Sequence, residues 1–346
     1  MTKVWTVNQT AIDEAAALLK AGAVVAFPTE TVYGLGANGL DRDAVLAIFA
    51  AKGRPADNPL IQHVADPEGL HALVQTVPPV ARALAEAFWP GPLTLVLPAR
   101  ELVPLEARGG LPTVGVRCPA HPWARRLIEA CGFPIAAPSA NRSGRPSPTT
   151  AQAVLEDMEG RIPLILDGGP CAVGLESTVV GFQGGVPVVL RPGGVTPAQI
   201  EAVAGAVRVD DAVLHQLAEG AVAASPGMKY RHYAPQARVT VVDGSVEGRT
   251  RRICALYDSV LATGGNPAIL AAAANAGRYG SRAVYSMGQD DADQAAALFE
   301  TLRRLDADGR TDAFAEALEP SGLGLAVMNR LLRAAGFRVV HGEEEP

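Results

Sequence analysis

The hydrophobic positions of this chain fall into two patterns. Short runs of consecutive apolar residues, bounded by Gly, Pro or Ser, are typical of buried strands, whereas apolar residues three and four positions apart are typical of helices. The short runs predict strands at 24–27, 60–64, 93–97, 113–117, 134–138, 164–166, 179–182 and 186–190. Because the two patterns alternate along the chain, the sequence predicts an α/β protein.

Helix-capping residues mark where several amphipathic stretches begin. A Ser, Thr, Asp or Asn side chain accepts a hydrogen bond from the first free amides of a helix, and a Gln three residues later strengthens the signal. We therefore expect helices to begin at Thr10, Asp41, Thr149 and Thr196, the last with Pro197 at its first helical position. Helical spacing also covers 67–74, 79–88 and 122–131.

Glycines dominate the stretch that follows the apolar run 24–27. We interpret Gly34, Gly36 and Gly39 as a sharp turn that approaches another group closely. Their spacing matches G-x-G-x-x-G, but a dinucleotide fingerprint needs its first Gly at the strand end and an acid about 20 residues later. Here residues 28–33 separate the strand from the glycines, and the next strand ends in His63. This context argues against a nicotinamide nucleotide site.

The pattern changes after residue 207. Residues 208–237 show no regular period, yet they are aromatic and basic, and we expect a linker that either serves as a lid over a bound anion or packs the second domain against the first. Beyond it, apolar runs predict strands at 239–242, 253–257 and 283–285, and helical spacing predicts helices at 295–305 and 325–335. The chain should therefore divide into a catalytic domain at 1–207, the linker, and a smaller α/β domain with a parallel sheet at 238–346.

Composition excludes several classes of protein. The chain has 346 residues, 48% hydrophobic and 5% aromatic, with a net charge of −6. An acidic balance argues against tight binding of nucleic acid through phosphate neutralisation. The four cysteines form no C-x-x-C pair, and no apolar run approaches the ~18 residues of a membrane span. Without a signal-peptide pattern either, we expect a cytoplasmic protein with no membrane contact.

Cationic and hydroxyl side chains follow several predicted elements. Lys52, Arg54 and Arg191 lie in loops rich in Gly and Pro, and the planar fork of arginine matches phosphate and carboxylate oxygens. Each could be plain surface charge, but the three together favour an anionic ligand. Ser139 lacks a nucleophile elbow and His63 lacks a metal-ligand cluster, so we favour polar contacts over covalent or metal chemistry. Such a site works by positioning and electrostatics.

An ordered set of motifs resembles the YrdC-like family. The motifs are PTETVYGLG, KGRP and NPL between 28 and 60, Pro-Ser-Ala-Asn-x-Ser-Gly at 138–144, Glu-Ser-Thr at 176–178 and Arg-Pro-Gly at 191–193. The segment SPGMKYRHYAP and the second α/β unit resemble the longer, two-domain form, the threonylcarbamoyl-AMP synthases. The resemblance implies a YrdC-like twisted mixed sheet. It also implies an enzyme that converts L-threonine, bicarbonate and ATP into threonylcarbamoyl-AMP and pyrophosphate. A tRNA threonylcarbamoyl transferase complex would use the product.

The same resemblance assigns site residues. Threonine would be held by Thr31, His63, Arg117, Ala137 and Ser177, with Arg117 on its carboxylate. The nucleotide would be lined by Arg54, Asn58, Thr113, Ser139, Asn141, Ser147, Arg191 and, from the linker, Tyr230. The catalytic set would be Lys52, Arg54, Ser139 and Asn141. Mg2+ would travel on the phosphates of ATP, so we expect no protein-built metal site.

Two other functions remain open at this stage. An RNA-binding module without ATP turnover fits a basic concave face, although the acidic total and the lack of stacking aromatics near the Arg loops weigh against it. Another ATP-using carbamoyl transferase, of the hydrogenase-maturation type, would carry zinc-finger Cys pairs that this sequence lacks.

Overall fold

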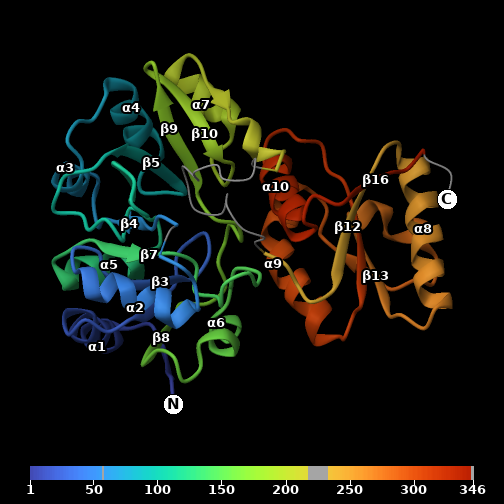
Figure 1. Cartoon of the computed structure of the whole chain (residues 1–346), viewed down its shortest axis with the longest axis horizontal. Helices are drawn as coiled ribbons and strands as arrows, with labels where there is room; N and C mark the ends of the chain where they lie inside the picture. The colour runs from blue at the N-terminus through green and yellow to red at the C-terminus, as the bar shows by residue number, and fades with distance from the viewer. Residues whose placement is uncertain (57, 217–232, 344–346) are drawn as a thin grey trace. The chain divides into compact units, whose positions relative to one another are not determined.

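The computed structural model describes residues 1–56, 58–216 and 233–343. Within them the chain forms two compact units. The first contains Met1–Ser143 and Ser147–Val213, and the second contains Gly144–Pro146, Leu214–Gln216 and the described residues from 233 onward. Most of the expected linker, Tyr230 included, lies outside the described residues. Figure 1 labels many of the elements of both units.

The first unit is built on a large mixed sheet. Its strands run in the order β1-β8-β2-β3-β7-β4-β6-β5-β9-β10-β11. They are β1 (Lys3–Thr6), β2 (Val25–Phe27), β3 (Gly34–Asn38), β4 (Ile61–His63), β5 (Leu93–Pro98), β6 (Thr113–Arg117), β7 (Ile135–Ala137), β8 (Leu164–Asp167), β9 (Thr178–Gln183), β10 (Val186–Arg191) and β11 (Arg208–Val209). Parallel pairs such as β4–β6 and antiparallel pairs such as β9–β10 occur in the same sheet.

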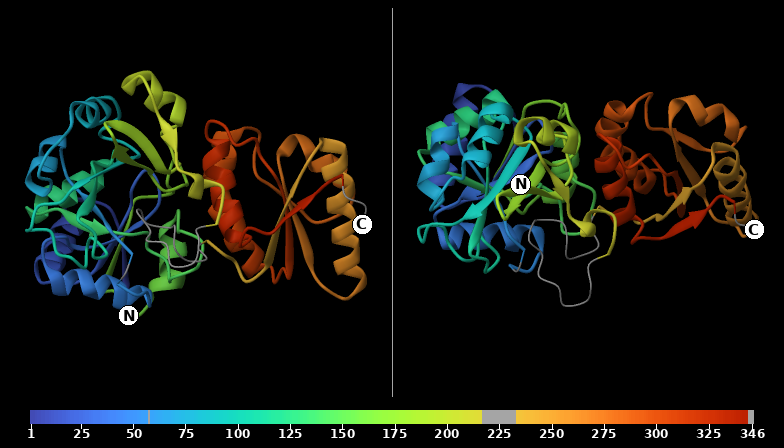
Figure 2. Two further views of the ribbon diagram at one scale, coloured as in Figure 1. Left: turned by 45° about the horizontal axis from the view of Figure 1, so that its top comes forward. Right: turned by 90° about the horizontal axis from the view of Figure 1, so that it is seen from above.

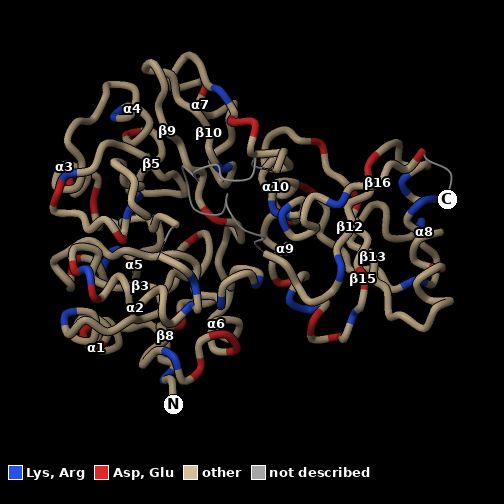
Figure 3. The backbone as a smooth tube through the Cα atoms, viewed as in Figure 1, with Lys and Arg blue, Asp and Glu red and all other residues tan. Residues whose placement is uncertain are grey.

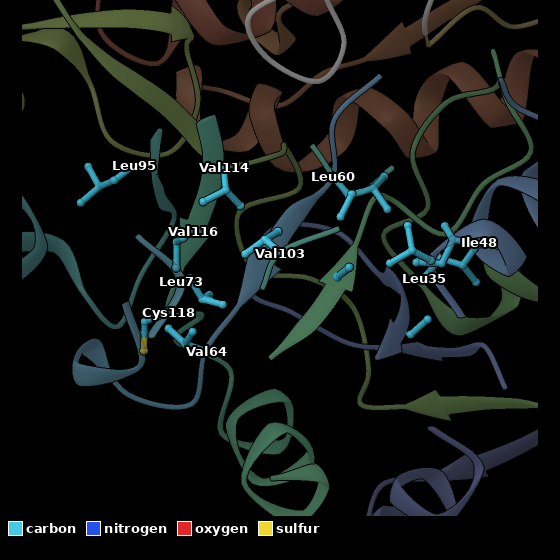
Figure 4. Packing of buried hydrophobic residues seen from close by; sticks show 14 of the residues in the cluster. Leu35, Ile48, Leu60, Val64, Leu73, Leu95, Val103, Val114, Val116 and Cys118 are labelled. Atoms are coloured by element: carbon cyan, nitrogen blue, oxygen red, sulfur yellow. The ribbon is translucent and has the colours of Figure 1, made fainter. Parts of the chain in front are cut away.

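Helices cover both faces of this sheet. They are α1 (Gln9–Lys20), α2 (Arg42–Lys52), α3 (Leu70–Leu73), α4 (Pro79–Phe88), α5 (Pro122–Cys131), α6 (Ala151–Met158) and α7 (Pro197–Ala204), with short 3-10 turns η1 (Pro67–Gly69) and η2 (Asp211–Val213). Helices α1 and α5 pack together over one apolar cluster. Helices α2, α4 and α6 bury their apolar residues in the other, larger cluster, where Leu35 of β3 lies beside Ile48 of α2 (Figure 4).

The second unit is a three-layer α/β structure. Its five strands run β14-β13-β15-β12-β16, all parallel. They are β12 (Arg238–Asp243), β13 (Pro267–Ala271), β14 (Val284–Ser286), β15 (Asp312–Glu316) and β16 (Val339–His341), and the helices are α8 (Val246–Ala262), η3 (Ala273–Tyr279), α9 (Asp291–Ala307) and α10 (Gly324–Ala334). Figure 2 shows α8 on one face of this sheet and α9 with α10 on the other. The predicted fold class, a mixed sheet plus a smaller parallel sheet, is confirmed.

Several capping predictions hold and two are displaced. Asp41 caps α2 through the amides of Asp43 and Ala44, and Thr196 forms the expected capping box with Gln199. Helix α1, however, is capped by Asn8 rather than by Thr10, because the Asn8 side chain accepts a hydrogen bond from the Ala11 amide. Helix α6 is capped by Thr150, whose hydroxyl accepts the Ala153 amide, rather than by Thr149.

The strand predicted at 253–257 is wrong, because these residues lie inside α8. Ile253 and Tyr257 are both buried and stand four residues apart, which places them on one face of a helix. A short apolar run cannot distinguish a buried helical turn from a strand. The sequence reading also missed β13 and β15, whose residues are buried throughout.

The predicted close approach at the glycines is confirmed and Gly39 lies in a turn, but the turn predicted at Gly34 and Gly36 is wrong. Gly34 and Gly36 lie in strand β3, which pairs antiparallel with β2. A Cβ on Gly36 would stand 2.7 Å from Ile135 Cγ2 and 2.8 Å from Phe27 Cε1. The absence of a side chain at these glycines therefore lets Phe27 and Ile135 pack directly against the backbone of β3. The connection between β2 and β3 is the polar loop 28–33.

We expect Gly36→Ala to lower the free energy of unfolding of the first unit by about 1–3 kcal/mol, because the added methyl must displace Ile135 and Phe27 in a packed core. Thermal unfolding monitored by calorimetry measures this change. Gly277→Ala is the matched control, since no atom lies within 4 Å of the added Cβ. Equal effects of the two substitutions would contradict the packing role of Gly36.

Candidate active site

The loop between β2 and β3 meets the end of β6 at a buried ion pair. Arg117, the last residue of β6, places Nη2 2.7 Å from Glu30 Oε1, and the two side chains are only 4% and 12% exposed. Its Nη1 donates to Thr31 Oγ1 at 2.9 Å, and its Nε donates to the Gly91 carbonyl at 3.2 Å. Burial raises the pKa of the Glu30 carboxyl, but Arg117 and the Ala120 amide outweigh burial and lower that pKa overall.

The hydrogen-bond directions around Thr31 can be worked out. The Thr29 hydroxyl donates to the Val32 carbonyl at 2.6 Å, so its oxygen must accept the Thr31 hydroxyl, 2.8 Å away. Thr31 Oγ1 in turn accepts from Arg117. A hydroxyl oxygen has two lone pairs, so Thr31 retains one acceptor site for a further donor.

His63 lies beside this group at the end of β4. Strand β4 pairs with β6 so that His63 stands opposite Arg117. Its Nδ1 lies 3.1 Å from the Ile61 carbonyl and 3.3 Å from the Ile135 carbonyl, which requires Nδ1 to carry the hydrogen. Burial, with a smaller contribution from Arg117, lowers the pKa of His63 to about 3. The ring is therefore neutral, and Nε2 is a hydrogen-bond acceptor.

Lys52 fixes the loop that follows β7. The αL conformation of Gly53 ends helix α2 so that Lys52 is buried at 4% exposure. Its Nζ donates to the carbonyls of Ser139 at 2.5 Å and Asn141 at 2.7 Å. Ser139 Oγ donates to Asn141 Oδ1 at 2.5 Å. Burial and the charge of Arg54 lower the pKa of Lys52, and the charges of Asp157 and Glu176 partly offset this lowering.

A third group joins β9 and β10. Arg191, at the end of β10, donates through Nη2 and Nε to the Ser177 carbonyl at 2.9 and 3.1 Å. The Ser177 hydroxyl lies 2.8 Å from Thr94 Oγ1 and 3.2 Å from Arg191 Nη2. The adjacent Glu176 accepts the Ser147 hydroxyl at 2.5 Å. All these side chains are buried.

These groups are neighbours in the fold. Ser139 forms a β-bridge with Gly34, immediately after the Thr31 loop, and the Ala140 amide donates to the Tyr33 carbonyl. Ala137 is the last residue of β7 and stands opposite Ile61 of β4. Adjacent strands and the loops between them therefore carry most of the residues that the sequence predicted, namely Thr31, Lys52, His63, Arg117, Ala137, Ser139, Asn141, Ser177 and Arg191.

Three further predicted residues lie around this group. Asn58 is fully buried, and neither amide atom of its side chain has a hydrogen-bond partner among the described residues. Arg54 stacks its guanidinium 5.9 Å from the centre of the Phe49 ring. Thr113, opposite Pro98, lines an open apolar hollow of about 560 Å³ together with Val96, Leu111 and Phe182.

Sequence reasoning missed three acceptors that shape the site: Glu30, Thr94 and Glu176. A pattern of cations that bind an anion does not point to the acids next to Thr31 and Ser177. The available signal was an acidic residue inside each polar motif, TET and EST. A buried arginine or lysine needs such partners.

Other site classes are not represented in the described part of the chain. Within residues 1–56, 58–216 and 233–343, no three His, Cys, Asp or Glu side chains come together as metal ligands. Nor does any described helix combine the length and the apolar character that a membrane span needs. Figure 3 shows Lys/Arg and Asp/Glu interspersed along both units.

The fold and the site define an α/β protein with buried cations and hydroxyls at the strand ends. Residues 17–193 match the Sua5/YciO/YrdC family, described as telomere recombination, and residues 195–336 match the family described as threonylcarbamoyl-AMP synthase, C-terminal domain. The chain belongs to this Sua5/YciO/YrdC family, in the form that carries the C-terminal domain.

Similar proteins extend over nearly the full length. The chain is 50% identical over 326 residues to the threonylcarbamoyl-AMP synthase of Pyrococcus abyssi, covering 94% of both chains. It is 46% identical over 343 residues to the enzyme of that name from Bacillus subtilis, covering 98% of this chain and 97% of the other. The crystal structure of P. abyssi Sua5 complexed with L-threonine has a TM-score of 0.91 at 47% identity, covering 99% and 98%. The chain is thus an enzyme of the nucleotidyltransferase class.

The neutral state of His63 predicts a pH dependence. The unfolded chain takes up a proton at this ring below pH ~6.5, whereas the folded ring does not until about pH 3. The free energy of unfolding should therefore fall as the pH drops from about 6.5 towards 3, by up to about 1.4 kcal/mol per pH unit.

Imidazole NMR checks the same point directly. The His63 resonances, identified by their loss in His63→Gln, should show the Nδ1–H tautomer with constant shifts between pH 5 and 8. The slope of stability with pH should decrease in that variant. A His63 ring that titrates near pH 6.5 would show that it is not held neutral.

Proposed function

We propose that this enzyme makes threonylcarbamoyl-AMP and pyrophosphate from L-threonine, bicarbonate and ATP. The observation that carries the proposal is the buried group of Thr31, Arg117 and neutral His63, which offers both a cation and free acceptors in a small space. A zwitterionic hydroxy amino acid presents the complementary carboxylate, ammonium and hydroxyl. The names of the similar enzymes and the L-threonine in the P. abyssi structure support the same ligand.

Threonine would lie at the ends of β4, β6 and β7. Arg117 donates two N–H groups to the protein and pairs through Nη2 with Glu30, and its remaining donors suit the threonine carboxylate. Thr31 Oγ1 and His63 Nε2 would accept from the ammonium or hydroxyl. Ala137 and Ser177 would complete the pocket.

The nucleotide would extend from this pocket along the polar loops. Ser139, Asn141, Ser147 and Arg191 would line the phosphates and ribose together with Arg54 and Asn58. The Asn58 amide has no hydrogen-bond partner among the described residues, which supports a ligand contact, because a buried amide without a hydrogen bond costs about 1–3 kcal/mol. The apolar hollow next to Thr113 has the size and lining to hold a purine ring. Tyr230, also proposed for this site, lies outside the described residues.

The reaction is a carboxylation followed by an adenylyl transfer. The threonine amine nitrogen attacks the carbon of CO2 formed from bicarbonate, loses a proton, and becomes a carbamate while water leaves. A carbamate oxygen then attacks the α-phosphorus of ATP, the bond from that phosphorus to the β-phosphate oxygen breaks, and pyrophosphate leaves. Arg54 and Arg191 would stabilise the charge on the phosphates, and Lys52 would hold Ser139 and Asn141 in place.

Mg2+ would enter with ATP and neutralise charge on its phosphates. The product is a mixed anhydride that water destroys, so a second enzyme must consume it. We propose that a tRNA threonylcarbamoyl transferase complex does so in the cytoplasm, and that this chain itself does not bind nucleic acid tightly.

The first test is substrate dependence. Pyrophosphate release should require ATP, bicarbonate and L-threonine together. Valine should replace threonine at least about 100-fold less well, since a pocket built for a hydroxyl rejects a ligand without one. Steady-state pyrophosphate assays with each component omitted measure this. Equal rates with valine would contradict the pocket assignment, and salt-dependent RNA binding without turnover would favour a binding module instead.

The second test concerns Arg54. Arg54→Ala should lower kcat/KM by about 100-fold or more, because a cation that stabilises transition-state charge is lost. The unfolding free energy should change by no more than about 1 kcal/mol, the range for an aromatic stacking contact. Arg126→Ala is the matched control, because Arg126 also stacks on an aromatic ring, Trp123, at 5.0 Å. Normal turnover in Arg54→Ala, or a comparable loss in the control, would remove Arg54 from the site.

A further inference from the structure

Glu30 is a buried acid that the proposed reaction does not yet use. It lies between Thr29 and Thr31 in the loop from β2 to β3, and its carboxylate takes the Nη2 group of Arg117 at 2.7 Å. The charge of Arg117 and the Ala120 amide lower the pKa of this carboxyl against the effect of burial. The acid is therefore a charged partner of Arg117.

Arg117 is held at three points that come from different segments. The carbonyl of Gly91, which precedes β5, accepts a hydrogen bond from Nε. In the β2–β3 loop, Thr31 Oγ1 accepts a hydrogen bond from Nη1, and the Glu30 carboxylate forms the ion pair with Nη2. A guanidinium carries five N–H groups in one plane, so two hydrogen bonds and the ion pair fix that plane and give the remaining donors a set direction. Without Glu30, the hydroxyl of Thr31 and one carbonyl would have to hold a long, flexible side chain.

Stability alone explains the pair poorly. Two charges buried together regain by attraction roughly what they lose in hydration, and apolar replacements of such pairs are often equally stable. A pair that adds little to folding and yet orients a guanidinium beside Thr31 and His63 suits a functional role.

We propose that Glu30 is a positioning residue that fixes the Arg117 guanidinium for the carboxylate of the amino-acid substrate. The inference rests on the proposed function, since it takes threonine as the ligand of Arg117. Glu30 acts through Arg117 and makes no contact with the nucleotide. Its loss should weaken threonine binding and leave ATP binding unchanged.

The test compares Glu30→Gln with the unmodified full chain. Titration calorimetry measures binding of L-threonine and of L-threonine amide, which lacks the carboxylate charge, and pyrophosphate assays give KM for threonine and ATP. Glu30→Gln should raise the threonine KM and Kd at least about 10-fold and change the ATP KM by less than about twofold. Threonine amide should bind the unmodified enzyme weakly. Its Kd for Glu30→Gln should be nearly the same as its Kd for the unmodified enzyme.

Two additional variants keep the result interpretable. Asp312→Asn removes a comparable acid that pairs with Arg238 Nη2 at 2.6 Å in the second unit, and it should leave the threonine KM unchanged. Glu30→Asp, which retains the charge with a shorter reach, should show an intermediate loss. It replaces Glu30→Gln if that protein does not fold.

Three results would overturn the inference. They are an unchanged threonine KM in Glu30→Gln, an equal rise in the threonine and ATP KM values, and an equal weakening of threonine and threonine amide. The last would mean that Glu30 does not act through the carboxylate site. Failure of the unmodified enzyme to release pyrophosphate with threonine would instead refute the proposed function itself.

Discussion

Two buried cations, Lys52 and Arg117, determine how the strand ends are arranged. A charge removed from water must find oxygen acceptors, and each finds them on segments distant in sequence. Lys52 at the end of α2 takes the carbonyls of Ser139 and Asn141, and Arg117 at the end of β6 takes Gly91, Thr31 and Glu30. The loops that carry the candidate ligand groups are therefore positioned by the same side chains that give the site its positive charge.

The close crossing of strands makes these contacts possible. Because Gly34 and Gly36 have no side chain, the Phe27 ring and Ile135 pack directly over β3, and β3 can lie between β2 and β7. That order places the loop 28–33 beside Ser139, which bridges to Gly34. The glycines of β3 thus help to position the candidate site residues in loop 28–33 and at Ser139.

The sequence predicted what depends on local pattern and missed what depends on partners. The buried strand 113–117 and the start of α2 at Asp41 follow from apolar alternation and from the cap that an aspartate side chain provides. Glycines at 34 and 36 read as a turn because only the folded sheet reveals the ring that covers them. Part of helix α8 resembles a strand in sequence. Ile253 and Tyr257 are four residues apart, which places them on one face both in a helix and in a strand. The role proposed for Glu30 depends on Arg117, which lies 87 positions later in the chain. No local sequence pattern connects the two residues.

The same contacts indicate what kind of catalysis the site performs. The Ser139 hydroxyl donates to an amide oxygen of Asn141, which cannot take up its proton, so Ser139 is not activated as a nucleophile. Burial raises the pKa of Cys171 to about 12 and that of Cys118 to about 11, so both thiols stay protonated. Burial lowers the pKa of His63 to about 3, so its ring is a weak base. What remains are fixed charges and oriented hydrogen-bond partners, which suit a reaction whose nucleophile is the substrate's own nitrogen and then its carbamate oxygen. For such a reaction the rigidity of Arg117 and of the Ser139–Asn141 loop matters more than the reactivity of any side chain, because the barrier is lowered by bringing two anions together in line.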